Sequence, residues 1–414
     1  MRRRVVVTGM GIVSPLGHTV DQAFQNAVEG VSGIDVIDTF DTKELKVKIA
    51  AQVKNFDASK HLSKKEIRRQ DLFSQFAVYA ACDAFEDAQL KEQVDPKRMG
   101  VLLGTGMGGT QTFAHDLNRA FEFGINKIPP MFIPMIIPNM ASGNVSIALG
   151  AQGHTSTVTT ACAASTHAMG DALRMIQHGY ADVMITGGSE ASVNPYTLAG
   201  FSALTALSLN ENPKKASRPF DKNRDGFVLG EGAGILIFEA LEHALNRGAK
   251  IYCEVVGYGS TGDAYHITAP SGVGAQEAMR LALEDGSLKP EDVTYINAHG
   301  TSTPINDKFE TEAIKQVFKD HAPHLKISST KSVHGHCLGG TGGIEAILSI
   351  RAITDGIIPP TMNYETFDDQ CDLNYVPNHP QKGEVDVVMS NSLGFGGHNA
   401  VIVFRKYGER DVLK

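Results

Sequence analysis

Residues 157–170 read TVTTACAASTHAMG and place a thiol, Cys162, where a β-branched run changes to small residues. The β-branched run predicts a strand and the small residues a helix start, so Cys162 falls at a strand-to-helix turn. The N–H groups and dipole of a helix start favour an anion, so we expect a thiolate to form more easily there. Cys162 is therefore a candidate nucleophile that a substrate carbonyl could approach. The alternative, a small buried apolar side chain, stays open.

A second chemical motif is INAHGTSTPINDKFET, residues 296–311, in which apolar residues lead to His299 and then to hydroxyls. Loops at the carboxyl ends of strands are where α/β sheets place ligands. His299 could donate a hydrogen bond to developing charge or move a proton, and Thr301 and Thr303 could bind an amide-bearing substrate arm. Alternatively, these hydroxyls cap the helix that follows.

A third motif, STKSVHGHCLGGTGGIEA at residues 329–346, holds charged and imidazole groups among glycines. They are Lys331, His334, His336 and Glu345, with Cys337 beside them. The HGHC run resembles a zinc-ligand pattern, but no second cysteine pair or paired carboxylate has ligand spacing nearby, so we expect no metal. A fourth motif, NSLGFGGHNA at 391–400, surrounds Phe395 with glycines. This pattern predicts either a mobile aromatic that gates a pocket or offers its N–H, or a tight turn between two late strands.

Two glycine patterns imitate a dinucleotide-binding loop. GTGMGG at 104–109 fits the pattern G-x-G-x-x-G and follows an expected strand, and GMGIVS at 9–14 fits the same pattern in part. Pro15 interrupts the helix that the second would need, and the first is not followed by a strand ending in an acidic residue. We therefore do not expect a nicotinamide or flavin dinucleotide.

Strand and helix signals alternate along the chain, which predicts an α/β protein with covered sheets. The stretch RRQDLFSQFAVYAACDAFEDAQL, residues 68–90, predicts one long amphipathic helix. The regions around Cys162 and His336 both follow the order strand, small-residue elbow, helix and stop glycine, at Gly179 and Gly356. This likeness predicts two related halves, residues 1–250 and 251–414.

Composition narrows the function classes. The chain has 414 residues with 38 basic and 46 acidic side chains, a net charge of -8, and no long basic stripe, which disfavours nucleic acid. The apolar run after MRRR is too short for a signal peptide, and no stretch of about 18 apolar residues predicts a membrane span. Five scattered cysteines are typical of reduced thiols. We expect a soluble, cytoplasmic protein with no membrane insertion.

Taken together, the motifs resemble the β-ketoacyl-[acyl-carrier-protein] synthases, most closely the elongating type II class. The resemblance runs nearly end to end through TACAAS, NAHGTSTPIND, STKS with GH, and GFGGHN, and also through RPFD (218–221) and GFVLGEGAG (226–234). It implies a thiolase-like fold with duplicated βα halves in α-β-α-β-α layers, assembled as a homodimer. It also implies a reaction in which an acyl group on the nucleophile is extended by two carbons from malonyl-carrier protein, with loss of carbon dioxide.

The resemblance assigns roles residue by residue. Cys162 carries the acyl group, His299 and His336 donate to the malonyl enolate, and the N–H groups of Cys162 and Phe395 form a second oxyanion hole. Lys331 and Glu345 support the histidines without touching substrate. Thr301 and Thr303 hold the pantetheine arm, and Met107 and Phe201 line the acyl pocket. No cofactor or metal is implied, because the thioester and the released carbon dioxide drive the reaction.

The implied partner is an acidic acyl carrier protein, which requires a basic landing patch. SKKEIRRQD at 63–71 offers four basic side chains and a fifth lies further on: Lys64, Lys65, Arg68, Arg69 and Lys127. A solvated helix start is the alternative for any one of them.

The sequence departs from relatives at several places. Residues 150–160 read GAQGHTSTVTT where many relatives have Gly-Pro, and His334 and Cys337 are additions near the site. Met107 stands where relatives often have isoleucine, which makes the accepted chain length open.

Three other interpretations compete with the elongating synthase. A polyketide ketosynthase would share the fold and often stands in a longer chain. This sequence ends shortly after the expected fold does, which favours a discrete fatty acid enzyme, although discrete polyketide synthases exist. A thiolase or an initiating synthase is disfavoured by the pair His299 and His336. A non-catalytic partner subunit that shapes a chain tunnel is disfavoured because Cys162 is present.

Overall fold

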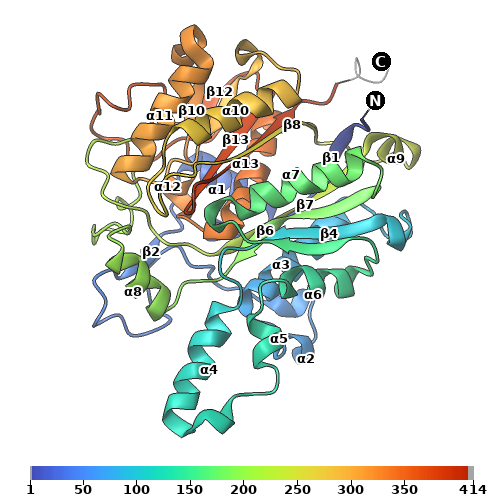
Figure 1. Ribbon diagram of the computed structural model, residues 1–414, viewed down its shortest axis with the longest axis vertical. Helices are drawn as coiled ribbons and strands as arrows, with labels where there is room; N and C mark the ends of the chain where they lie inside the picture. Colours follow the sequence, from blue (N-terminus) through green and yellow to red (C-terminus); the bar gives the residue numbers. More distant parts are fainter. Residues whose placement is uncertain (1, 409–414) are drawn as a thin grey trace.

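A computed structural model describes residues 2–408, and ten strands of this part join in one mixed sheet (Figure 1). The strand order is β10-β9-β13-β14-β8-β1-β7-β6-β4-β5. The bounds are β1 Val5–Val13, β4 Met99–Gly104, β5 Thr155–Val158, β6 Val183–Glu190, β7 Gly232–Ala240, β8 Cys253–Gly262, β9 Tyr295–Asn297, β10 Lys326–Ser328, β13 Val387–Gly394 and β14 His398–Arg405.

The sheet consists of two sets of five strands with the same pattern of directions. In the first set β7 runs antiparallel to β1 and β6, while β4 runs parallel to β6 and β5. In the second set β14 runs antiparallel to β8 and β13, while β9 runs parallel to β13 and β10. The two sets meet through three residue pairs between β1 and β8, Val5–Val7 with Cys253–Val255. The duplicated fold that the resemblance implied is confirmed.

Helices separate and cover the two sets. Outside the first set lie α3 Leu72–Asp87 and α6 Met140–Leu149, and outside the second lie α10 Val273–Asp285 and α11 Pro304–Phe318. Between the sets lie α7 Ala164–Gln177 and α13 Thr341–Asp355, which pack on strands of both (Figure 1). The other α-helices are α1 Val20–Glu29, α2 Lys64–Ile67, α4 Thr110–Phe123, α5 Phe132–Ile136, α8 Pro195–Ala203, α9 Leu241–Asn246 and α12 Lys331–His334. Two short ribbons, β2 Asp35–Val36 with β3 Ile49–Ala50 and β11 Ile357–Ile358 with β12 Gln381–Lys382, complete the described part.

The strands are apolar on both faces because each face meets a helix layer. In β7, Ile235 and Ile237 pack with the outer helices, while Leu236 and Phe238 pack with the central helices. A polar side chain on either face would lose its hydration unless it gained a partner, which explains the apolar run AGILIF, residues 233–238. The buried Glu239 that follows is paired with Arg247.

Both predicted elbows are present. The strand β5 leads through the short 3-10 turn η4, Ala161–Ala163, into α7, and β10 leads through α12 and the turn η7, Leu338–Gly340, into α13. Each turn opens with a residue in the left-handed region, Ala161 at φ +50° and Leu338 at φ +43°. The two turns contact each other, so the fold presents them at one place from opposite sets.

The long helix predicted over residues 68–90 is shorter than expected. It begins at Leu72, because the carboxylate of Asp71 accepts the N–H of Phe73 at 3.1 Å and caps the start. Arg68 and Arg69 therefore lie on the connection between α2 and α3. Within residues 2–408, the helices all fall short of the length and hydropathy needed to cross a membrane.

Candidate active site

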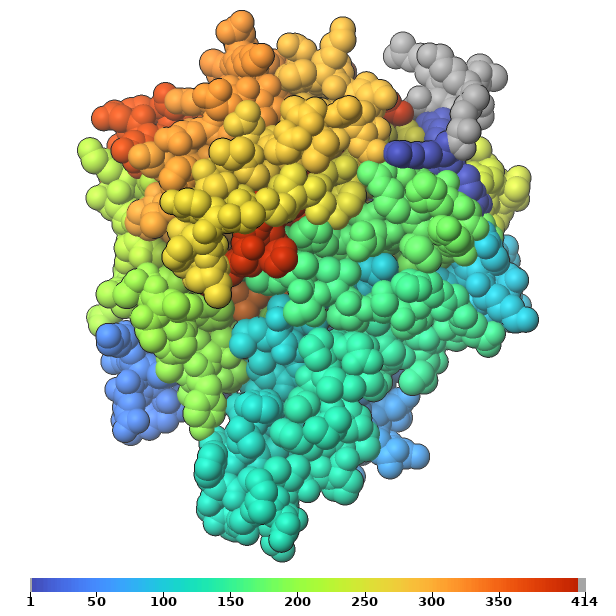
Figure 2. All heavy atoms as spheres, in the orientation of Figure 1, coloured from blue at the N-terminus to red at the C-terminus, as the bar shows by residue number. Residues whose placement is uncertain are grey.

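The residues that the sequence singled out converge on one cavity of about 390 Å³. Seven of them line it: Cys162, Phe201, His299, Thr301, Thr303, His336 and Phe395. They come from both sets of strands, and in Figure 2 the red turn between β13 and β14 lies recessed between yellow and green parts of the chain. A substrate in this cavity would therefore contact both halves of the duplicated fold.

Cys162 occupies the middle of η4, directly before the first turn of α7. The expectation that this position favours the thiolate is wrong as a net effect. Burial raises the pKa of the thiol to about 12, against the opposing influence of the Lys331 charge and of nearby N–H groups. The resting sulfur is therefore a protonated thiol, and its proton must leave as the sulfur attacks.

Two backbone N–H groups, those of Cys162 and Phe395, interact with the sulfur of Cys162. The close approach of the two segments depends on Gly394. A Cβ at Gly394 would lie 2.9 Å from the carbonyl oxygen of Thr160 and 3.3 Å from the nitrogen of Cys162. Because only glycine leaves this space open, the end of β13 can bring the Phe395 N–H to the elbow.

The two imidazoles meet edge to face. The ring centroids of His299 and His336 lie 5.4 Å apart at an interplanar angle of 82°, and the ring of Phe227 lies 5.2 Å from that of His336. The Nδ1 of His336 bonds the hydroxyl of Thr341 at 3.1 Å. If Thr341 donates in this bond, the ring proton is on Nε2, and this tautomer can donate to an oxygen in the cavity.

The main chain around His299 is held by a buried carboxylate. Glu310, in α11, accepts the N–H of His299 and the N–H of Gly300, both at 2.8 Å. The amide of Asn391 in β13 donates to the same carboxylate at 3.2 Å. The ring of His299 therefore projects from a main chain with little freedom, as a preorganised donor requires.

A buried ammonium lies behind both histidines. The Nζ of Lys331 donates to the carbonyl of His299 and to Glu345, both at 2.6 Å, and both side chains are almost completely enclosed. Burial raises the pKa of Glu345 to about 7, while the Lys331 charge opposes that shift. Burial and then the same charge lower the pKa of His299 and of His336 well below 6.5. Both rings are therefore neutral near pH 7, so they can donate one proton and accept another.

The comparisons with known proteins agree on one family. The family model described as "Beta-ketoacyl synthase, N-terminal domain" matches residues 2–244, and the one described as "Beta-ketoacyl synthase, C-terminal domain" matches residues 252–365. The chain belongs to the β-ketoacyl synthase family.

Individual relatives cover almost the whole chain. The chain is 52% identical over 408 residues to a 3-oxoacyl-[acyl-carrier-protein] synthase 2 of Staphylococcus aureus (strain COL), covering 98% of this chain and 99% of the relative. It is 51% identical over 410 residues to the protein of the same name from Synechocystis, covering 98% and 99%. Among solved structures, a type II PKS ketosynthase in complex with its acyl-carrier protein has a TM-score of 0.92 at 36% identity, covering 98% of this chain and 100% of that one.

In this synthase the threonine loop faces the cavity. The hydroxyls of Thr301 and Thr303 lie 2.9 Å apart and both residues line the cavity. Thr303 stands at the N-cap position of α11, yet its hydroxyl bonds Thr301 instead of the first-turn N–H groups. The predicted capping role of these hydroxyls is therefore wrong for Thr303, and its side chain remains available to a ligand.

A second, mostly apolar cavity of about 470 Å³ adjoins the first through Phe201, which lines both. Met107 lines this second cavity with aromatic and aliphatic side chains, among them Phe113, Leu117 and Phe121. The ring of Phe201 lies 5.3 Å from that of Phe227. The structure thus places Met107 outside the catalytic cavity, on the far side of Phe201.

The five predicted basic side chains are all exposed. Lys64 and Lys65 lie on α2, Arg68 and Arg69 follow it, and Lys127 lies in the separate short turn η3, Ile125–Lys127. The first four form one group, which we call the α2 patch.

The HGHC run has separate hydrogen-bond partners for its side chains. The Nε2 of His334 bonds the Thr330 hydroxyl at 2.9 Å, and the thiol of Cys337 donates to the Glu231 carbonyl at 3.3 Å. Within the described residues, potential metal ligands gather elsewhere, at His61, Asp83 and Glu86. There the Lys60 ammonium already bonds Asp83 at 2.6 Å, which disfavours a further cation.

Sequence reasoning missed several residues that hold the site. Glu310 and Thr341 position the histidines, and Glu190 accepts the N–H groups of Gly106 and Met107 on one side and of Gly339 on the other. The glycines beside them in the motifs were a usable signal, because backbone N–H groups in glycine turns need acceptors. Glu310 lies inside the His299 motif, eleven residues after His299, whereas Glu190 lies far in sequence from the N–H groups it binds.

We expect both site imidazoles to stay neutral as the pH falls from 8 to 6. A depressed pKa means that protonation starts only well below 6.5, where the folded state would have to charge a buried ring. Nitrogen-15 NMR of labelled histidines, assigned with His299→Asn and His336→Asn, measures this directly. A titration midpoint near 6.5 for either ring would contradict the arrangement described.

Proposed function

We propose that this protein is an elongating 3-oxoacyl-[acyl-carrier-protein] synthase, an acyltransferase of fatty acid biosynthesis. It joins malonyl-carrier protein to an acyl group held on Cys162 and releases carbon dioxide. The observation that carries the proposal is the single cavity in which a cysteine at a helix start faces two neutral histidines. Each step below uses these groups alone, without a cofactor or a metal.

In the first step the thiol of Cys162 attacks the thioester of acyl-carrier protein. The new oxyanion is stabilised by the N–H groups of Cys162 and Phe395, which come from two segments and lie close enough to the sulfur to lower its pKa. The C–S bond to the carrier breaks, the acyl group remains on Cys162, and the thiol proton passes through a neutral imidazole to the leaving thiolate.

In the second step a malonyl thioester occupies the same cavity. Its carboxylate leaves as carbon dioxide, and the electron pair forms an enolate whose oxygen accepts hydrogen bonds from His299 and His336. The enolate carbon then attacks the acyl carbonyl on Cys162. The C–S bond to Cys162 breaks, the β-ketoacyl product leaves on the carrier, and the cysteine sulfur takes a proton from water, because the overall condensation consumes one proton.

Replacing Cys162 by alanine is expected to separate the two half-reactions. Cys162→Ala removes the acyl acceptor, so condensation falls by more than about 1,000-fold, while malonyl decarboxylation persists because both imidazoles remain. Mass spectrometry of carrier-bound products and release of labelled carbon dioxide measure the two activities. Full condensing activity in this variant would remove the assignment.

Replacing His336 by alanine is expected to have the reverse effect. His336→Ala removes one donor to the enolate, so malonyl decarboxylation falls by about 100-fold or more, while acylation of Cys162 is largely kept. The acyl-enzyme is measured by intact-protein mass after mixing with acyl-carrier protein. Loss of acylation with decarboxylation intact would reverse the roles given to these residues.

We propose the α2 patch, with Lys127 as an addition, as the landing surface for the acidic carrier protein. Four exposed cations within six positions produce a local positive field although the whole chain is negative. The PKS structure with its acyl-carrier protein supports a carrier as partner.

Charge reversal tests this surface. Lys65→Glu with Arg68→Glu should raise the KM for acyl-carrier protein by about tenfold at low salt, with a smaller effect at high salt, because the charges act on encounter. Lys319→Glu with Lys382→Glu changes the same number of exposed charges in the other half and serves as control. An unchanged KM in the first variant places docking elsewhere.

We propose the second cavity, with Met107 and Phe201, as the acyl-chain pocket, and a homodimer as the assembly. Large apolar side chains stay exposed on and near the projecting α4 arm, including Phe121 at 87% and Ile125 at 69% (Figure 1). The strand β5 is an edge of the sheet. A second copy would cover both surfaces.

The predicted halves, residues 1–250 and 251–414, remain our proposal for the domain division, with residues 409–414 outside the described part of the chain. The two matched family regions, 2–244 and 252–365, support a domain boundary between residues 244 and 252. A cytoplasmic location is proposed together with the role in fatty acid synthesis.

A polyketide-type ketosynthase is the second candidate function, favoured by the structural likeness to a PKS ketosynthase. Incubation with malonyl-carrier protein and a series of acyl-carrier proteins separates the two. A single two-carbon extension per cycle supports the fatty acid enzyme, and products extended several times without reduction support the other.

A further inference from the structure

The loop that carries the two cavity threonines has an unfavourable backbone. Gly300 has φ +35° and Ser302 has φ +67°, and the left-handed region is uncommon for a residue with a side chain. Such a conformation persists when surrounding contacts determine it. Besides Glu310 and Asp307 of α11, the contacts that hold residues 302–304 of this loop come from a segment about eighty residues away in sequence, 218–226, which lies between α8 and β7.

Ser302 is bound at each of its polar groups. Its N–H donates to Asp307 at 3.2 Å, its hydroxyl accepts the N–H of Arg218 at 2.9 Å, and its carbonyl accepts the N–H of Gly226 at 3.0 Å. Asp307 also accepts the N–H of Phe220 at 2.8 Å. The loop is therefore attached to the segment 218–226 at several points.

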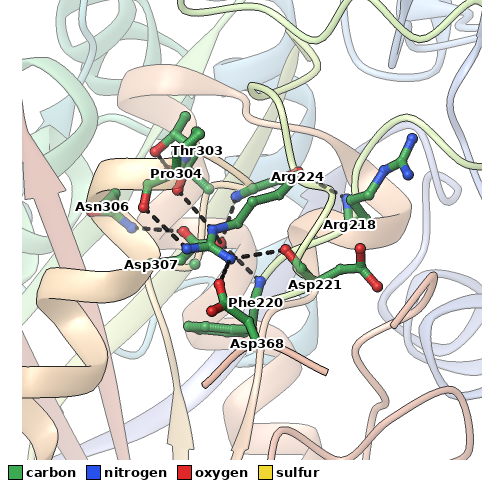
Figure 3. A network of polar contacts seen from close by, with 12 residues as sticks. Arg218, Phe220, Asp221, Arg224, Thr303, Pro304, Asn306, Asp307 and Asp368 are labelled. Atoms are coloured by element: carbon green, nitrogen blue, oxygen red, sulfur yellow. Dashed lines mark hydrogen bonds and ion pairs between the residues drawn. The ribbon is translucent and has the colours of Figure 1, made fainter. Parts of the chain in front are cut away.

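Arg224 holds the next two residues of the loop (Figure 3). Its Nε donates to the carbonyl of Thr303 at 3.2 Å and its Nη2 donates to the carbonyl of Pro304 at 3.1 Å. The same guanidinium bonds the Asp221 carbonyl at 2.8 Å and the Asp368 carboxylate at 2.5 Å, and lies 3.8 Å from Asp307. Its side chain is only 4% exposed, so it does not serve solvent or an external ligand.

We propose that Arg224 is a positioning residue for the thioester arm, which fixes the main chain of Thr303 and Pro304 so that the threonine hydroxyls face the cavity. The inference rests on the proposed function, since it takes the pantetheine arm as the ligand of Thr301 and Thr303. Arg224 comes from the first family region and the threonines from the second. The arm subsite is thus completed across the two halves, by an arginine that does not touch the arm.

The fork of the guanidinium suggests the first variant. Arg224→Lys keeps a cation near Asp307 and Asp368 but cannot reach both carbonyls at once. We expect the KM for malonyl-carrier protein, and for malonyl-CoA, which has the same arm without the carrier protein, to rise about tenfold. The value of kcat should stay within about twofold and the iodoacetamide alkylation rate of Cys162 should not change. A lowered kcat with unchanged KM would overturn the inference.

A double-mutant cycle separates positioning from a general loss of stability. Thr301→Val with Thr303→Val removes both arm contacts, so Arg224→Lys added to them should raise KM no further. Independent, multiplying effects on KM would show that Arg224 does not act through the threonines. Arg351→Lys is the matched control, because Arg351 bonds Asp21 and Asp355 outside the cavity; it should lower the melting temperature without changing KM.

If Arg224→Lys does not fold, Asp368→Asn provides the same test. Asp368 bonds the outer side of the guanidinium and its side chain is 14% exposed, so its loss is tolerated better. A rise in KM at constant alkylation rate supports the inference, and an unchanged KM overturns it. Turnover of the unsubstituted protein tests the proposed function itself. Failure of the proposed function would appear as no turnover in that protein, whereas failure of the Arg224 inference would appear as an unchanged KM in the variants.

Discussion

The positive charge of Lys331, enclosed with Glu345, acts on every reacting group of the site. Burial alone raises the pKa of Cys162 and lowers those of His299 and His336, since each charged form loses its hydration. The ammonium opposes the first shift and adds to the other two. It thus favours a neutral imidazole while making the developing thiolate less costly, although it contacts the site only through the carbonyl of His299. Placed in solvent, the same charge would be screened and would influence none of the three strongly.

This electrostatic arrangement requires the duplicated fold. The cysteine comes from the elbow before α7 and the histidines from loops after β9 and β10, so two copies of one strand order must meet for the groups to share a cavity. There is little space between the two elbows. The two short turns contact each other, and the hydroxyl of Ser165 behind Cys162 bonds the carbonyl of Gly339 in the opposite elbow. Small residues around Cys162 therefore serve packing and chemistry together, because larger side chains would separate the elbows and close the path to the sulfur.

The sequence alone predicts the parts of this arrangement that are local. Apolar strands, stop glycines and the two elbows each depend on a few neighbouring residues around Cys162 and His336, and the structure contains them. The balance that sets the pKa of Cys162 could not be predicted in this way, because it depends on how deeply the elbow is buried by the other half. The start of α3 was predicted wrongly for a related reason: the cap at Asp71 competes with three preceding residues, 68–70, that have good helix propensity. The role of Arg224 could not be predicted because it binds main chain about eighty residues away in sequence, whereas Glu310 lies inside the His299 motif, where an acidic residue near a helix start has an ordinary explanation.

The raised pKa of Cys162 has a consequence for the order of events. A free thiolate in the resting enzyme would be reactive toward any electrophile that entered, whereas a protonated thiol becomes nucleophilic only when a carbonyl lies against the N–H groups of Cys162 and Phe395. In the proposed reaction those donors stabilise charge that appears on the substrate oxygen, and a neutral imidazole accepts the thiol proton in the same step. After acylation that proton is gone and the sulfur is neutral, so the imidazoles return to donating. In the proposed reaction the same pair then stabilises the malonyl enolate. Loss of carbon dioxide moves the negative charge of the malonyl carboxylate to the enolate oxygen, so the net charge of the cavity does not change in that step.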